Sequence, residues 1–179
     1  MNCLSGAIFL ALCATVLCTK PSLQDLQEAL STNDKIWIGL RNFYSAAGTD
    51  VLCVYDKVTT RSGTSYTLEH GYRKEEKTFT GTLTATAMKE GDEAVLNVKI
   101  PEEGQDNKHV LKYWNSEQKN CFILELHNKT SNFKQCQLHI WDNALTDYNP
   151  QRFPCEDKYD EYCGTTKHAV YSSTCRTAQ

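Results

Sequence analysis

Six cysteines constrain the fold of this chain more than any other feature. The sequence holds nine, of which Cys3, Cys13 and Cys18 fall in an apolar N-terminal stretch. The other six are Cys53, Cys121, Cys136, Cys155, Cys163 and Cys175. An even set in a secreted chain predicts three disulfide bonds but leaves their pairing open. A metal site is the alternative, but the chain has no C-x-x-C pair and the spacings are irregular, so we expect none.

Residues 1–18 are expected to form a signal peptide. The stretch from Leu4 to Leu17 is apolar and uncharged, and it is too short to span a bilayer. The small residues Val16 and Cys18 predict cleavage after residue 18 or 19, with a signal anchor as the alternative. We therefore expect a secreted, extracellular protein that has one domain over residues 19–179 and no membrane span.

Charge and motifs argue against nucleic-acid binding and catalysis. The net charge is −3, whereas nucleic-acid binding requires a basic surface. The histidines form no H-x-x-x-H pattern, and the chain has neither a G-x-S-x-G elbow nor a glycine-rich phosphate loop. If all six cysteines pair, no thiolate nucleophile is left. We expect no enzyme activity and no cofactor. Asn128-Lys129-Thr130 is a sequon that predicts an N-linked glycan at Asn128.

The hydrophobic period changes from helical to extended after Leu30. Leu23, Leu26 and Leu30 recur with helical spacing, and Ser22 is a suitable N-cap. Short turn-forming links then join eight extended stretches, over residues 36–44, 51–60, 65–73, 77–88, 93–100, 108–114, 120–126 and 133–141. A second short helix is expected after Pro154, ending at Gly164.

Short links between successive strands predict an antiparallel up-and-down meander. Eight such strands can close into a barrel that holds one small ligand. A β-sandwich is the rival architecture, but it usually needs long crossovers, which this chain lacks. The predicted fold class is therefore all-β with short helices, built as an eight-stranded barrel.

Several segments along the chain together resemble the tick salivary lipocalins of the histamine-binding protein family. They are Asp34-Lys35-Ile36-Trp37, Cys53, Asn120-Cys121-Phe122-Ile123, Trp141-Asp142, the segment from Cys155 through Lys158 and Tyr159 to Tyr162, and Cys175. The resemblance implies a lipocalin barrel whose N-terminal and C-terminal helices pack outside it. It also implies the disulfides Cys53–Cys175 and Cys121–Cys155, which leave Cys136–Cys163 as the third.

The resemblance also implies a ligand and a host partner. Histamine binders carry an Asp and a Trp before the first strand cysteine, but here Asp50 stands without a Trp. The segment from Gln137 to Trp141 lacks the expected Glu. Both differences favour a sterol or a fatty acid over histamine or serotonin, which remain the alternative. The chain further resembles the Japanin group, linked to sterol binding and dendritic-cell suppression. We expect a monomer that binds one small molecule and acts on a host immune-cell protein.

Strand alternation predicts which side chains face the cavity. A strand cysteine bonded to a segment outside the barrel must point outward, so its neighbours point inward. This places Leu52, Gln135 and Leu126 inside. On the strands without a cysteine the inward positions rest on apolar character alone, and they include Leu111 with either Tyr113 or Trp114. The predicted ligand-binding residues are Val54, Asp56, Tyr66, Leu68, Phe79, Leu83, Leu96, Val98, Phe122, Leu124, Gln137, His139 and Trp141. They combine an apolar surface with a few polar groups, as ligand pockets commonly do.

Each assignment has a structural alternative. Small barrels can be filled by their own side chains, which would leave no cavity. Asp56 could be a solvated carboxylate at a strand end, and His139 a hydrogen-bonded structural histidine. Trp37 and Trp141 could be aromatics that close the barrel.

Overall fold

The computed structural model describes residues 20–44, 48–100, 106–127, 133–145 and 152–177. The predicted signal peptide and the predicted glycosylation site Asn128 lie outside the described residues. Within the described part of the chain, no helix is long and apolar enough to cross a membrane.

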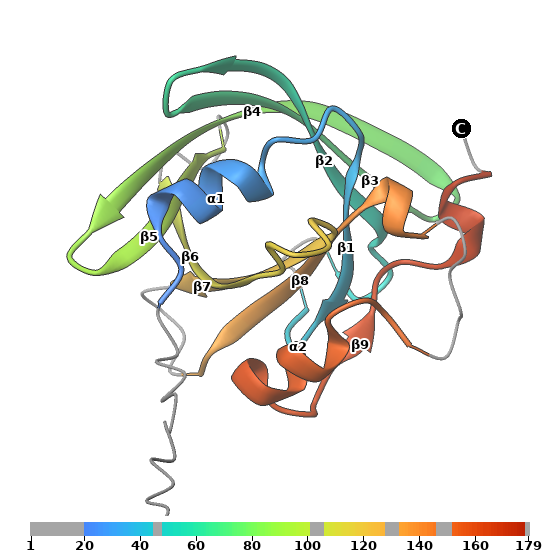
Figure 1. Ribbon diagram of the computed structural model, residues 1–179. Helices are drawn as coiled ribbons and strands as arrows, with labels where there is room; N and C mark the ends of the chain where they lie inside the picture. The colour runs from blue at the N-terminus through green and yellow to red at the C-terminus, as the bar shows by residue number, and fades with distance from the viewer. Residues whose placement is uncertain (1–19, 45–47, 101–105, 128–132, 146–151, 178–179) are drawn as a thin grey trace, which may run out of the picture.

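The strands form a closed antiparallel barrel, as predicted (Figure 1). The eight barrel strands are β1 Ile36–Arg41, β2 Leu52–Ser62, β3 Ser65–Lys74, β4 Lys77–Glu90, β5 Glu93–Lys99, β6 Asp106–Trp114, β7 Cys121–His127 and β8 Gln135–Trp141. Each pairs with the next along the chain, and β1 pairs with both β8 and β2, which closes the barrel. The short strand β9, His168–Ala169, adds to β1 from outside.

The helix α1, Leu23–Ala29, seals one end of the barrel (Figure 1). Ser22 and Asp25 form a capping box at its start: the Ser22 hydroxyl accepts from the Asp25 amide, and the Asp25 carboxylate accepts from the Ser22 amide. Leu26, Ala29 and Leu30 are buried against the inner side of the barrel. The indole Nε1 of Trp141 donates to the Ala29 carbonyl over 3.0 Å and so ties α1 to β8.

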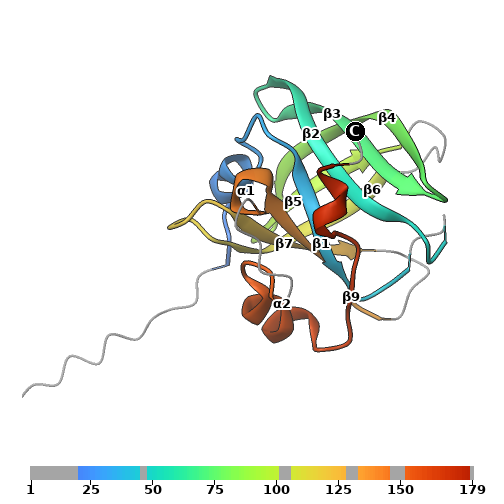
Figure 2. The ribbon, with the colours of Figure 1, turned by 90° about the vertical axis from the view of Figure 1, so that its right-hand side faces the viewer.

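The C-terminal part of the chain packs against the outside of the barrel (Figure 2). It contains α2, Glu156–Cys163, and the short 3-10 helix η2, Ser173–Cys175. The disulfides are Cys53–Cys175, Cys121–Cys155 and Cys136–Cys163, the pairs implied by the family resemblance. The buried Tyr159 of α2 adds a hydrogen bond from its hydroxyl to the Cys136 carbonyl.

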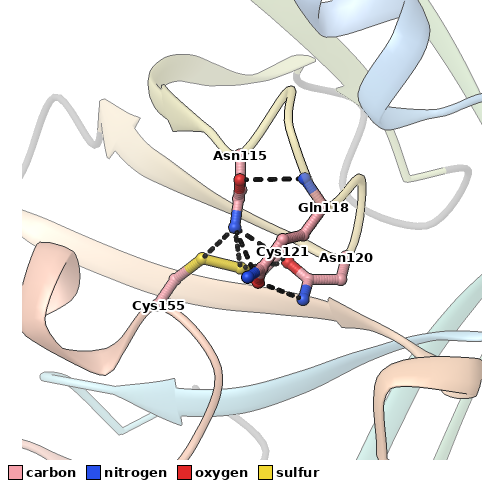
Figure 3. The surroundings of a disulfide bond; sticks show 5 residues. All are labelled: Asn115, Gln118, Asn120, Cys121 and Cys155. Carbon is pink, nitrogen blue, oxygen red and sulfur yellow. Dashed lines mark hydrogen bonds between the residues drawn. A yellow bond between two sulfur atoms is a disulfide. The ribbon is translucent and has the colours of Figure 1, made fainter.

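The Cys121–Cys155 bond is framed by the turn between β6 and β7 (Figure 3). The side-chain amide of Asn115 donates to the side-chain oxygens of Gln118 and Asn120, and it also lies 3.8–3.9 Å from the two sulfur atoms. The side-chain Oδ1 atom of Asn115 accepts from the backbone N–H of Gln118. This turn therefore fixes the position of the sulfur atoms where β7 begins.

Successive residues of one strand belong to different hydrophobic clusters, one inside the barrel and one outside it. Cys121 and Ile123 join the outer cluster, whereas Phe122 and Leu124 join the inner one. Strand β8 divides in the same way, with Cys136, Leu138 and Ile140 outside. The strand cysteines therefore mark the outer face of the barrel.

One predicted inward position is wrong and one open choice is settled, in both cases where a β-bulge interrupts the alternation. Leu52 pairs with Arg73 and Tyr55 with Gly71, so β2 has one residue more than β3 over this interval. The extra residue reverses the direction of Leu52, which is 38% exposed. A second bulge between Leu111 and Tyr113 turns Tyr113 outward and leaves Trp114 as the inward aromatic.

Candidate ligand-binding cavity

The barrel encloses a cavity of about 840 Å³. All eight barrel strands contribute to its wall. Ten of the predicted residues line it: Asp56, Leu68, Phe79, Leu83, Leu96, Val98, Phe122, Leu124, Gln137 and His139. This volume lies in the usual range for small-molecule sites, roughly 300–1,000 Å³. The side chains of this barrel therefore leave room for a ligand.

Three predicted residues do not line the cavity. Tyr66 and Trp141 are buried in the inner cluster that α1 covers, so they fill the closed end of the barrel. Val54 packs in a small cluster with Ile38, Val51 and Val170. Strand β2 bulges at this point, and the C-terminal segment covers it through a hydrogen bond from the Cys53 amide to the Val170 carbonyl.

Asp56 and His70 form a polar pair on the cavity wall. They are opposite one another on β2 and β3, with His70 Nδ1 and Asp56 Oδ1 2.7 Å apart. Burial lowers the pKa of His70, but the hydrogen bond and the charge of Asp56 outweigh it and raise that pKa. Burial raises the pKa of Asp56, but the hydrogen bond from His70 and the nearby histidines lower it overall. The pair is therefore stable as an ion pair.

His139 and Gln137 form a second polar group on β8. The Nε2 atom of His139 lies 3.2 Å from the Gln137 Oε1 atom, and its ring stacks on Phe122 at 4.8 Å between ring centres. Burial lowers the pKa of His139 to about 3, so the imidazole is neutral at physiological pH. A neutral His139 donates its N–H to the Gln137 carbonyl oxygen, which leaves the Gln137 NH₂ group as a donor toward the cavity.

Arg41 is a cavity residue that sequence reasoning missed. The register between β1 and β8 shifts between Ile38 and Leu40, so Leu40 turns outward and Arg41 turns inward. Strict alternation from Trp37 would place Arg41 outside. The sequence feature that could have indicated this shift is Gly39, because a glycine inside a strand often marks a bulge or a close approach. In the structure an added Cβ atom at Gly39 would lie 2.7 Å from the Ile140 side chain.

The environment of Arg41 is unusual for a cation. The residue is only 6% exposed, and its Nε atom has no hydrogen-bond partner in the described part of the chain. Burial lowers its pKa to about 10, while the charge of Asp56 acts in the opposite direction. The guanidinium carbon lies 5.7 Å from the centre of the Phe43 ring.

Two lining histidines were also absent from the predicted set. His70 continues the inward series of Tyr66 and Leu68 on β3, so alternation could have found it. His109 faces Leu126 across β6 and β7. Burial lowers its pKa more than its hydrogen bond to the Asn107 carbonyl raises it. The described residues contain no group of three or more side chains that could hold a metal ion.

A closed meander around a cavity of this kind defines a lipocalin-like ligand-binding barrel. The tick histamine-binding protein family model matches residues 18–177, and the chain belongs to that family. No curated protein sequence matches the chain.

Two solved structures share the fold. Japanin from Rhipicephalus appendiculatus bound to cholesterol is 12% identical with a TM-score of 0.55, over 80% of this chain and 96% of Japanin. AM182 in a serotonin complex is 15% identical with a TM-score of 0.61, over 84% of this chain and 91% of AM182. At these identities the likeness concerns the fold alone.

Proposed function

We propose that this protein is secreted and captures a small, largely apolar ligand of the sterol or fatty-acid type inside its barrel. The observation that carries this proposal is the chemistry of the cavity wall. Leu68, Leu83, Leu96, Val98 and Leu124 supply apolar surface on four strands. Among the described lining residues Asp56 is the one carboxylate, and His70 already binds it.

A biogenic amine is the alternative ligand, and the same wall argues against it. A buried ammonium group needs a carboxylate, because an unpaired buried charge costs several kcal/mol. Asp56 would have to exchange His70 for the amine, and the buried cation Arg41 would oppose the incoming positive charge. The serotonin complex of AM182 keeps this alternative open to experiment.

Calorimetry with cholesterol, oleic acid, histamine and serotonin tests the proposal. We expect cholesterol or oleic acid to bind at micromolar or lower concentration, and both amines to bind at least about tenfold more weakly. Leu83→Trp should block the binding, because Leu83 lines the cavity. Thr84→Trp is the matched control, since Thr84 is the next residue on β4 and is exposed. Submicromolar histamine binding would contradict the proposal.

The proposal extends to the action of the protein on its host. Membership of the tick histamine-binding protein family supports a secreted modulator of host immune or inflammatory cells. The sequence resemblance to the Japanin group extends this proposal to dendritic-cell activation. We further propose that it is a monomer that carries a glycan on Asn128, and that it is not an enzyme. Dendritic cells exposed to wild type and to Leu83→Trp would show whether the cavity is needed. An equal response to both variants would assign the effect to the surface.

A further inference from the structure

We propose that the ligand carries a single carboxylate and that Arg41 and Gln137 bind it, with the apolar tail directed toward α1. This inference rests on the proposed function and names the chemical class of ligand for the same cavity: a long-chain monocarboxylic acid. It assigns to Arg41 the role of anion anchor.

Arg41 is the first part of the argument. A guanidinium offers five donors in a planar fork that matches the two oxygens of a carboxylate. Arg41 as a whole is 6% exposed, lines the cavity and forms no ion pair among the described residues. A buried cation that has no ion-pair partner is costly, and a bound anion would neutralise its charge.

Gln137 supplies a second donor at the right place. It is opposite Arg41 in the register between β1 and β8, so both side chains leave neighbouring strands on the inner face. His139 occupies the Gln137 carbonyl oxygen, and the NH₂ group is left to donate. One guanidinium and one amide NH₂ together can satisfy the oxygens of one carboxylate.

The charge balance of the wall limits the ligand to one negative charge. Asp56 is held by His70 through a 2.7 Å hydrogen bond, so it does not neutralise Arg41 by direct contact. The described lining residues include no lysine and no arginine besides Arg41. A phosphate monoester carries about −1.5 to −2 charges at neutral pH and would leave excess charge buried. A monocarboxylate matches the single cation.

The position of Arg41 sets the orientation of the ligand. Ile36, at the other end of β1, pairs with Trp141 beside the α1 seal. Arg41 lies roughly 16 Å further along the strand, at about 3.3 Å per residue, and therefore toward the open end. The wall between these two ends is largely apolar, with Leu96, Phe122 and Leu124 among its residues. A carboxylate at Arg41 thus directs an alkyl tail toward the closed end.

The test compares oleic acid with oleyl alcohol, which has the same chain and no charge, by tryptophan fluorescence at pH 8. Wild type should bind the acid at least about tenfold more tightly than the alcohol. Arg41→Gln should lose that preference and bind the alcohol as wild type does, while Arg41→Lys should keep part of it. Arg73→Gln, which removes a charge near the outer Cys53–Cys175 bond, is the matched control and should behave as wild type.

The other outcomes separate a failure of this inference from a failure of the proposed function. Equal binding of acid and alcohol by wild type, or an unchanged preference in Arg41→Gln, would overturn the inference while the proposed function stands. If oleic acid, oleyl alcohol and cholesterol all fail to bind, the proposed function fails and the inference fails with it. Thermal melting of ligand-free Arg41→Gln at or above the wild-type temperature is expected, because the variant removes an unpartnered buried charge. A lower melting temperature would contradict an unpartnered Arg41.

Discussion

Asp56 and His70 face each other across β2 and β3 inside the cavity, with the carboxylate oxygen 2.7 Å from the imidazole Nδ1 atom. Folding thus lowers the pKa of Asp56 from its ordinary value of 3.8 and raises that of His70 from 6.5. The stabilisation from Asp56 is present above its unfolded pKa and is lost as pH falls through its folded pKa. The stabilisation from His70 is full below pH 6.5 and is lost as pH rises through its folded pKa.

Asp56→Asn should therefore lower the pKa of His70 to below 6.5, because burial and the charge of Arg41 then act without opposition. The free energy of unfolding lost in this variant should be largest between about pH 4 and 6.5 and smaller on either side. NMR titration of the imidazole and urea unfolding at three pH values measure both effects. Asp92→Asn, in an exposed turn, is the control. An unchanged His70 titration would disprove the coupling.

His139 should make the protein sensitive to acid. Its pKa falls from 6.5 to about 3 on folding, so the unfolded chain binds one more proton between these values, and stability declines as pH falls below 6.5. Between pH 7 and 5 this contribution amounts to about 2 kcal/mol.

The measurement is urea unfolding of wild type and His139→Gln at pH 7 and pH 5. The variant should lose about 2 kcal/mol less than wild type over this interval. The same loss in wild type and His139→Gln would mean that His139 is protonated in the folded protein.

The disulfides should differ in their contribution to stability. The Cys53–Cys175 bond spans 122 residues and the Cys136–Cys163 bond spans 27. Because the longer loop restricts the unfolded chain more, replacing both cysteines by Ala should cost about 5 kcal/mol for the first bond and about 3.5 kcal/mol for the second. Denaturant unfolding of the two double variants gives this order. The reverse order would show that native-state contacts, rather than loop length, dominate.

Leu26 should be the main anchor of the α1 seal. Its side chain is fully buried against the inner cluster, so Leu26→Ala leaves a cavity and should cost about 3 kcal/mol of unfolding free energy. Gln24→Ala, on the exposed side of the same helix, should change stability by less than about 0.5 kcal/mol. A loss below about 0.5 kcal/mol in Leu26→Ala would show that the burial of Leu26 does not hold α1 in place.

Sequence patterns were sufficient to predict the barrel and most of the residues that line its cavity. Phe122 and Leu124 were predicted from Cys121, and Gln137 and His139 from Cys136, because β7 and β8 keep an unbroken alternation. The errors arise where a strand gains a residue. The bulge beside Cys53 reversed Leu52, and the shift between Ile38 and Leu40 brought Arg41 inside.

Such bulges depend on how one strand twists against its neighbours, and a single strand sequence carries little of that information. The interior position of Arg41 is a tertiary property of this kind. Between the two expected ligand types, a sterol and a fatty acid, its position favours the acid.

Each of the strands β2, β7 and β8 carries a disulfide bond on its outer face, and on β7 and β8 the bonded cysteine stands immediately beside a residue that lines the cavity. Substitution on the inner face can therefore proceed without loosening the bonds that hold the barrel closed. Ligand specificity in a barrel of this kind can therefore change through substitution of interior side chains while the three disulfide bonds stay in place.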